Sequence, residues 1–228
     1  MTLNQILKAV YATYLTNYFG FKIKQNKTSK NQKKYRIEYA QTLLGNLNIE
    51  AKVLNEEKVP QDGKFLIISN HKSVIDPLIV ELAFKHSNVF GHWIAKKELY
   101  NSFFFGVFVR NAGTILVDRE NTKMGSFFSE IKKAVTNGDS ISIFPEGTRN
   151  KTSDSLIEFQ GGAQMIALKN RLPILPIYIK TDANKVLMDS LHSGDEKFVI
   201  EVEVGEIIDY KDRKTPLQEK YKEMFGIS

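Results

Sequence analysis

The sequence predicts an α/β domain, with a mostly parallel mixed sheet flanked by helices, preceded by a helical segment at the N-terminus. From residue 64 onward, short apolar or β-branched runs alternate with helical stretches, the pattern of parallel strands joined by helices. Before that point, apolar residues recur at helical spacing. The 228 residues, 42% of them hydrophobic, can fill a sizeable core. We therefore divide the chain into an N-terminal helical segment, residues 1–48, and an α/β domain, residues 49–228.

The first helix is predicted over residues 3–18 and is expected to end near Gly20. Its apolar stripe follows spacings of three and four residues and is rich in tyrosine: Leu3, Ile6, Leu7, Val10, Tyr11, Tyr14, Leu15 and Tyr18. Basic residues without any acidic residue among them come next and are called the basic cluster below: Lys22, Lys24, Lys27, Lys30, Lys33, Lys34 and Arg36.

Two interpretations of this N-terminal segment are open. An amphipathic helix beside a basic cluster suits an anionic membrane surface, where each basic side chain close to the lipid contributes roughly 1 kcal/mol. A helix packed on its own domain and followed by a solvated lysine-rich loop has the same sequence pattern.

The remaining elements follow from the apolar periodicity. A second helix is predicted over residues 34–48. Strands are then predicted at 64–69, 89–95, 114–118, 139–144, 174–179 and in the region 197–208. Helices are predicted at 76–87, 98–109, 122–136, 158–169 and 215–224. In such a sheet, reactive groups gather at the carboxyl ends of the strands.

Composition excludes several kinds of site. The absence of cysteine excludes disulfides, thiolate zinc sites and cysteine nucleophiles. The four histidines include no pair spaced to hold one metal ion on a helix face. A net charge of +6 favours anionic partners such as nucleic acid, phosphorylated metabolites or anionic lipid. Neither a membrane-spanning apolar run nor a secretory signal is expected, which predicts a protein that stays in the cytoplasm.

The stretch SNHKSVIDP, residues 69–77, follows an apolar run and places an imidazole and a carboxylate five positions apart. Two side chains at this spacing cannot meet within one regular helix, so a contact between His71 and Asp76 requires a turn. Ser73 with Asp76 has the spacing of a capping box, and Pro77 is tolerated in a first helical turn. With Ser73 as the N-cap, Asp76 could orient His71 as a general base. The alternative is a plain helix cap beside a loop histidine.

Two further stretches carry charge at strand ends. GTILVDR, residues 113–119, delivers Arg119, whose planar fork suits a phosphate, although a carboxylate partner is the alternative. FPEGTRN, residues 144–150, leads from an apolar strand into a proline–glycine turn that carries Glu146 and Arg149. Such a turn can direct backbone N–H groups toward an anion.

A fourth stretch, LPILPIYI at residues 172–179, has two prolines in a strand-like run and suits an edge or irregular strand. N-H-x-x-x-x-D, GTILVDR, FPEGTR and LPILPI occur in this order, and together they resemble the four motifs of the glycerolipid acyltransferase family. Length and basic balance look most like the bacterial lysophosphatidate acyltransferases, which make phosphatidic acid. The chain departs from the family pattern at Gln160, where lysine is common, and at Asn150, where serine is usual.

The resemblance implies transfer of an acyl group from a thioester to a free hydroxyl of an acylated glycerol phosphate. His71 would take the proton from that hydroxyl while Asp76 orients the imidazole, a general-base contribution of roughly 10²- to 10⁴-fold. No metal or bound cofactor is implied, and the co-substrate is acyl-coenzyme A or acyl-acyl carrier protein.

The resemblance also implies a site for the acceptor phosphate. Its residues are Arg119, Glu146, Gly147, Thr148, Arg149 and Lys96. Among them, Arg119, Arg149 and Lys96 would hold the phosphate, and Glu146 with the Gly147 backbone would shape the pocket. The Gly147 amide and Thr148 are also candidate oxyanion donors.

A lipid substrate favours the membrane interpretation of residues 1–48, as a monotopic anchor on the cytoplasmic face of the inner membrane. FFFGVFV, residues 103–109, becomes a candidate wall for the acyl chain, with an ordinary buried helix as the alternative. Two other functions are alternatives. One is a related acyltransferase acting on glycerol phosphate or another lysolipid, and the other is a non-catalytic basic module that binds anionic lipid or nucleic acid. The acyltransferase interpretation expects no nucleic-acid partner.

Overall fold

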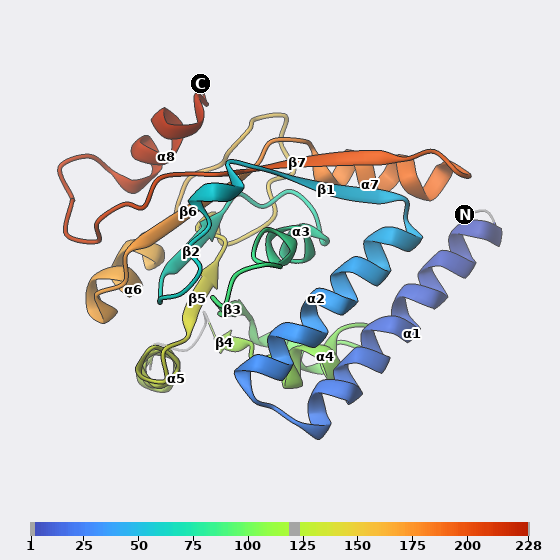
Figure 1. The fold of residues 1–228 in the computed structure, drawn as a ribbon, viewed down its shortest axis with the longest axis horizontal. Coiled ribbons are helices and arrows are strands. Elements are labelled where there is room, and N and C mark those ends of the chain that lie inside the picture. The colour runs from blue at the N-terminus through green and yellow to red at the C-terminus, as the bar shows by residue number, and fades with distance from the viewer. Residues whose placement is uncertain (1–2, 119–123, 228) are drawn as a thin grey trace.

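The computed structural model describes residues 3–118 and 124–227. Within these residues, seven strands form one sheet in the order β1-β7-β6-β2-β5-β3-β4 (Figure 1). The strands are β1 Ile49–Leu54, β2 Leu66–Ser69, β3 Gly91–Lys96, β4 Ile115–Val117, β5 Ser140–Ile143, β6 Ile174–Ile179 and β7 Phe198–Val204. All neighbouring strands are parallel except β6 and β7. The predicted α/β class with a mostly parallel mixed sheet is confirmed.

Helices cover both faces of the sheet (Figure 1). They are α1 Leu3–Gln25, α2 Ser29–Asn46, α3 Asp76–Ala83, α4 Gly106–Asn111, α5 Gly125–Thr136, α6 Gly162–Asn170, α7 Ala183–His192 and α8 Leu217–Phe225. Helices α1, α2, α3 and α7 share one cluster of buried side chains with the sheet, and α5, α6 and α8 share a second. The core therefore has two layers, one on each side of the sheet.

Two elements were not predicted, strand β1 and helix α7. Strand β1 pairs in parallel with β7, and its burial alternates from Ile49 onward because apolar and charged residues alternate along it. Helix α7 is capped by Asp182, whose side chain accepts the backbone N–H of Lys185. The alternation along β1 and the cap of α7 are both present in the sequence, but they cover too few residues to predict these elements.

The helix predicted over residues 98–109 is wrong in its central part. A 3₁₀ helix, Lys97–Asn101, is followed by a turn before α4 begins at Gly106. A Cβ atom at Gly106 would lie 2.8 Å from the carbonyl oxygen of Tyr100. The chain therefore folds back on itself there, and only glycine allows so close an approach.

The proline-containing strand β6 lies inside the sheet, so the expectation of an edge strand is wrong. Its antiparallel pairing with β7 begins at Ile177 and Val204, whereas an isolated bridge joins Ile174 to Ile208. The chain after β7 thus has one extra residue between these two pairs, which makes a bulge. Backbone N–H groups point alternately to the two sides of a strand, so the nitrogen of residue 176 points toward this bulge. Pro176, which has no N–H, therefore removes no hydrogen bond between β6 and β7. The irregular pairing is confirmed.

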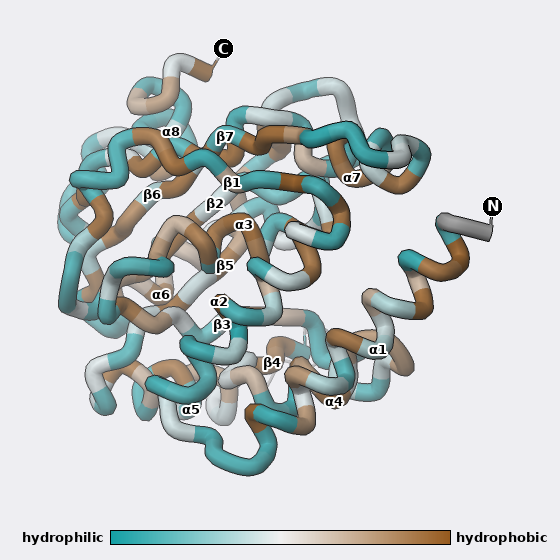
Figure 2. The backbone as a smooth tube through the Cα atoms, turned by 45° about the vertical axis from the view of Figure 1, so that its right-hand side comes forward, coloured by the Kyte–Doolittle hydropathy of each residue, from teal (hydrophilic) through white to brown (hydrophobic). Residues whose placement is uncertain are grey.

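Helix α1 continues past Gly20 to Gln25, so the predicted end near Gly20 is also wrong. A Cβ atom at this position would lie 2.8 Å from the backbone nitrogen of Phe108 in α4. Gly20 therefore serves close helix packing rather than a helix end. Figure 2 shows hydrophobic stretches along both α1 and α4, which lie side by side.

The side of α1 that faces away from the core is also apolar. Exposed large apolar side chains on α1 and on the segment before α4 form what we call the apolar surface: Ile6, Leu7, Val10, Tyr11, Tyr14, Tyr18, Phe21, Leu99, Tyr100, Phe103 and Phe104. The opposite side of α1 is buried at Leu15, Phe19 and Ile23. Helix α1 therefore both packs on the domain and presents apolar residues to the outside. In the part of the chain that the structure describes, no helix has the length and apolar character needed to cross a bilayer.

The basic cluster divides into buried and outward-facing members. Arg36 is only 3% exposed and forms an ion pair with Glu81, and the Lys33 ammonium donates to the carbonyl of Val89. Burial lowers the pKa of Lys33 to about 8. These two residues thus hold α2 against the domain, whereas Lys24, Lys27, Lys30 and Lys34 are exposed.

We expect Gly20→Ala to lower the free energy of unfolding by about 1–3 kcal/mol, because the added methyl group meets the α4 backbone. Gly45→Ala, in α2 with nothing within 4 Å of its added Cβ, is the matched control and should raise that free energy by about 0.5–1 kcal/mol. Urea unfolding of both variants provides the measurement. Equal effects of the two substitutions would contradict the close contact between α1 and α4.

Candidate active site

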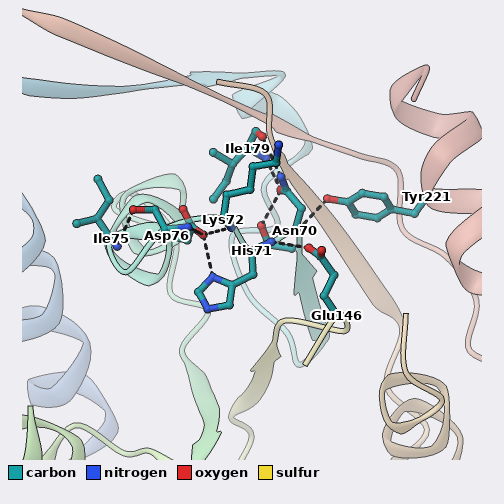
Figure 3. A network of polar contacts seen from close by, with 10 residues as sticks. Asn70, His71, Lys72, Ile75, Asp76, Glu146, Ile179 and Tyr221 are labelled. Atoms are coloured by element: carbon teal, nitrogen blue, oxygen red, sulfur yellow. Dashed lines mark hydrogen bonds and ion pairs between the residues drawn. The ribbon is translucent and has the colours of Figure 1, made fainter. Parts of the chain in front are cut away.

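His71 and Asp76 meet in the turn between β2 and α3. The Nδ1 atom of His71 lies 2.8 Å from Oδ2 of Asp76, and the same oxygen accepts the backbone N–H groups of Lys72 and Ser73, each at 2.7 Å (Figure 3). Asp76 is 1% exposed, and the side chain of His71 is 17% exposed. A buried carboxylate thus holds an imidazole that remains partly open to solvent.

The capping prediction for this turn is correct in one respect and wrong in another. The Asp76 carboxylate turns back to the N–H of Ser73, as predicted. However, the residue before α3 is Ile75, and Asp76 itself is the first helical residue. The Ser73 hydroxyl accepts the N–H of Ile75 at 3.4 Å within the preceding turn. Ser73 is therefore not the N-cap, because the chain makes a full turn before the helix begins. Pro77 lies in the first helical turn, as expected.

The segment after β5 holds the backbone of His71 from both sides. Oε1 of Glu146 accepts the N–H of His71 at 2.6 Å, and the N–H of Asn150 donates to the carbonyl of His71 at 2.6 Å. Asn150 is buried, and its side chain braces the loop through Thr152 and Asp154. Asn150, at the position where the acyltransferase motif usually has serine, therefore has a structural role.

Glu146 is 2% exposed and contacts backbone rather than solvent. Besides His71, its second oxygen accepts the N–H of Ile157 at 3.0 Å. Burial raises the pKa of Glu146 from its ordinary 4.5 to about 7, against the opposing effect of these two backbone hydrogen bonds. Glu146 therefore positions His71 and the loop that follows.

The neighbouring residues of this turn differ in exposure. The N–H of Gly147 donates to the carbonyl of Phe144 at 2.9 Å, and Gly147 has a φ of 70°, which favours glycine. That amide is therefore engaged in the turn. Thr148 and Arg149 are exposed and lie between Glu146 and Asn150, the two residues that hold the backbone of His71.

Lys96, another predicted residue, lies at the end of a neighbouring strand. Lys96 is the last residue of β3 and is exposed. Strands β2, β3 and β5 are parallel, so Lys96, His71 and Arg149 are at the same edge of the sheet. Arg119 lies outside the described residues.

Several residues around the pair were not identified from the sequence. The buried side chain of Asn70 bonds both backbone groups of Ile179, accepting at 2.8 Å and donating at 3.0 Å. The hydroxyl of Tyr221 in α8 donates to the carbonyl of Ile177 at 2.6 Å and accepts the N–H of Asn70 at 3.3 Å. Figure 3 shows Asn70 and Tyr221 beside the His71 turn, on the side away from Asp76. Asn70 is the first residue of the N-H-x-x-x-x-D motif, whereas no motif or local sequence pattern indicates Tyr221.

The arrangement is suited to proton transfer. A carboxylate at Nδ1 fixes that nitrogen as the protonated one and leaves Nε2 as the basic atom. Partial exposure allows a substrate hydroxyl to approach, while the buried Asp76 can stabilise the imidazolium that forms.

Comparison with known proteins bears on this site. The family model described as "Acyltransferase" matches residues 50–180, more than half of the chain. The chain belongs to the acyltransferase family. The match includes the His71–Asp76 turn, the segment after β5 and, apart from the first residue of β1, every strand of the described sheet except β7.

Individual relatives agree with this family. The 1-acyl-sn-glycerol-3-phosphate acyltransferase of Helicobacter pylori is 38% identical over 55% of this chain and 53% of its own length. The protein of the same name from Streptococcus pneumoniae is 28% identical over 75% of this chain and 61% of its own. The matches thus span between about half and two thirds of these two relatives.

A solved structure supports the fold. The crystal structure of the 1-acyl-sn-glycerophosphate (LPA) acyltransferase from Thermotoga maritima aligns with a TM-score of 0.66 and 19% identity. The alignment covers 96% of this chain and 93% of that one. The likeness therefore extends over the whole architecture, including the N-terminal helices.

The raised pKa of Glu146 predicts a pH-dependent stability. Between its ordinary pKa of 4.5 and about 7, the folded protein keeps a proton there that the unfolded chain has released. This contribution is therefore full below pH 4.5 and is lost as the pH rises through 7. Relative to Glu146→Gln, we expect the free energy of unfolding of the wild type to fall by about 1–2 kcal/mol across this range, allowing for solvent screening.

Urea unfolding at pH 5, 6, 7 and 8 measures this difference. Glu158→Gln, an exposed change in the following loop, is the control and should run parallel to the wild type. If the Glu146→Gln curve also ran parallel, the raised pKa would be wrong.

Proposed function

We propose that the protein is a lysophosphatidate acyltransferase, which moves a fatty acyl group from a thioester to the sn-2 hydroxyl of lysophosphatidate and forms phosphatidic acid for phospholipid synthesis. The observation that carries this proposal is the buried Asp76 carboxylate on Nδ1 of a partly exposed His71, in a chain of the acyltransferase family. Relatives that share this family are named for the same reaction.

In this reaction, Nε2 of His71 takes the proton of the acceptor hydroxyl as its oxygen attacks the thioester carbonyl. The tetrahedral intermediate collapses to the ester and expels a thiolate, which receives the proton from the imidazolium. Asp76 orients the ring and stabilises its charged form. No covalent acyl-enzyme is needed. The donor is acyl-coenzyme A or acyl-acyl carrier protein, and no metal or bound cofactor enters these steps.

The acceptor phosphate is assigned to basic residues at the same sheet edge as His71. Arg149 and Lys96 are exposed there, and Arg119 follows β4 in the sequence. An arginine can bind two phosphate oxygens at once, whereas lysine supplies a point charge. Gly147 and Thr148 shape the approach to Arg149, and Glu146 holds the turn that carries them.

The N-terminal segment, residues 1–48, is proposed to attach the enzyme to the cytoplasmic face of the inner membrane as a monotopic anchor. The apolar surface supplies side chains for the acyl region, and the outward-facing lysines of the basic cluster meet anionic headgroups. Phe103 and Phe104, both exposed, are the part of the 103–109 stretch available to an acyl chain. A lipid acceptor and an apolar donor tail can then enter the site from the bilayer.

The reaction is tested by incubating the protein with an acyl thioester and lysophosphatidate. We expect phosphatidic acid and free thiol, and a kcat reduced about 10²- to 10⁴-fold in His71→Ala because the general base is removed. Arg149→Ala should raise the acceptor KM more than Arg213→Ala, an exposed control. Equal turnover by wild type and His71→Ala would exclude the general-base role. If glycerol phosphate were turned over faster than lysophosphatidate, glycerol phosphate would be the acceptor.

The anchor is tested by flotation with vesicles that contain anionic lipid. Combined Val10→Glu and Tyr14→Glu should weaken binding more than tenfold, because each buried apolar side chain contributes about 1.5–3 kcal/mol. Met165→Glu is the control, since it is similarly exposed but lies on α6, away from α1 in Figures 1 and 2. Unchanged flotation of the double variant would restrict α1 to packing within the domain.

A further inference from the structure

The imidazole of His71 is the first of three stacked rings. It lies on the ring of Phe144, with centroids 3.9 Å apart and planes inclined by 9°. Phe144 in turn stacks on Trp93 at 4.8 Å and 24°. The three rings come from the ends of β2 and β5 and from the middle of β3, so three strands of the sheet place them together.

This stack adds a restraint that the hydrogen bond to Asp76 does not provide. A single hydrogen bond at Nδ1 fixes the direction of that nitrogen but allows the ring to rotate about the bond. Contact with a flat neighbouring ring fixes the plane of the imidazole. Both restraints together aim Nε2, and misplacement of a reacting group by about 1 Å can cost on the order of 100-fold in rate.

Trp93 is itself held by a hydrogen bond from its polar edge. Its Nε1–H donates to Oε1 of Glu81 at 2.8 Å. Glu81 lies on α3, the helix that begins with Asp76, and its side chain is 11% exposed. The carboxylate that orients His71 and the carboxylate that orients Trp93 therefore come from one short helix.

Glu81 connects this stack to the N-terminal segment through an ion pair with Arg36 of α2. The buried guanidinium also donates to the carbonyls of Gly91 at 2.9 Å and Ala112 at 3.2 Å. Gly91 is the first residue of β3, two positions before Trp93. Arg36 therefore fixes both the carboxylate that holds Trp93 and the strand that carries it.

We propose that Trp93 is a positioning residue for His71, and that Arg36 and Glu81 extend this positioning to α2. The N-terminal helical segment then takes part in aligning the base as well as in membrane contact. This inference rests on the proposed general-base role of His71. It adds three residues outside the motif set to the residues that determine the rate.

The kinetic test replaces Trp93 by Phe and by Leu. Trp93→Phe keeps a ring on Phe144 and loses the bond to Glu81, and Trp93→Leu loses both. We expect kcat to fall by about threefold and about 10- to 100-fold respectively, with the acceptor KM within about twofold of the wild type. Phe128→Leu, which removes a half-buried aromatic ring on α5, is the matched control and should leave kcat unchanged.

The urea midpoint of each variant separates positioning from folding. A kcat loss in Trp93→Leu that only follows its unfolded fraction, or a kcat equal to the wild type, would overturn the inference. A loss in folded protein with KM unchanged supports it.

A second measurement needs no turnover, because Trp93 is the only tryptophan in the chain. Arg36→Lys keeps the charge but lacks the planar fork that reaches Glu81 and two carbonyls. We expect a shifted Trp93 emission and a kcat lower by about threefold or more. Gln41→Met, exposed on the same helix, should change neither.

Unchanged emission in Arg36→Lys would overturn the link between α2 and Trp93. If the wild type itself did not form phosphatidic acid, the proposed function would fail instead. The emission of Arg36→Lys would then still decide whether α2 and Trp93 are coupled.

Discussion

The hydrogen bonds that converge on Oδ2 of Asp76 are the interaction on which the rest of the site depends. One buried oxygen accepts from the ring of His71 and from the backbone of Lys72 and Ser73. Because an ionised carboxylate is costly to bury without donors, this convergence holds the chain between β2 and α3 in one tight turn. The same contact sets the tautomer of the imidazole. The contacts that hold the turn therefore also orient the His71 ring.

Around this contact, buried polar side chains bind backbone, whereas the basic side chains at the same sheet edge are exposed. Glu146 and Asn70 each bond two backbone segments, which satisfies N–H and C=O groups at the carboxyl ends of the strands, where ladders end. Arg149 and Lys96 lie at the same edge but are exposed. This division explains how a motif such as FPEGTR can contain both a structural carboxylate and a basic residue suited to phosphate.

The alternation of helices and strands predicted most of the fold, and the spacing within the N-H-x-x-x-x-D motif predicted the contact between His71 and Asp76. The sequence could not indicate Tyr221, because its contact with Asn70 joins residues 151 positions apart and depends on how α8 packs. The stack of His71, Phe144 and Trp93 could not be predicted for the same reason, because its rings lie in or just after three different strands. At Gly20, a glycine in a helical pattern predicted an end, whereas its cause is the close approach of α4. Local rules therefore described turns better than contacts between elements.

The N-terminal segment illustrates why its two interpretations are not exclusive. Leu15 and Phe19 of α1 and Leu44 of α2 belong to the same buried cluster as Ile67 in β2. Removal of the segment would therefore uncover one face of the sheet, besides removing an apolar surface. A helix that is part of the core holds its outer side at a fixed place relative to the strand ends. In the proposed function, this rigidity means that packing, and not a flexible linker, sets the distance between the bilayer and His71.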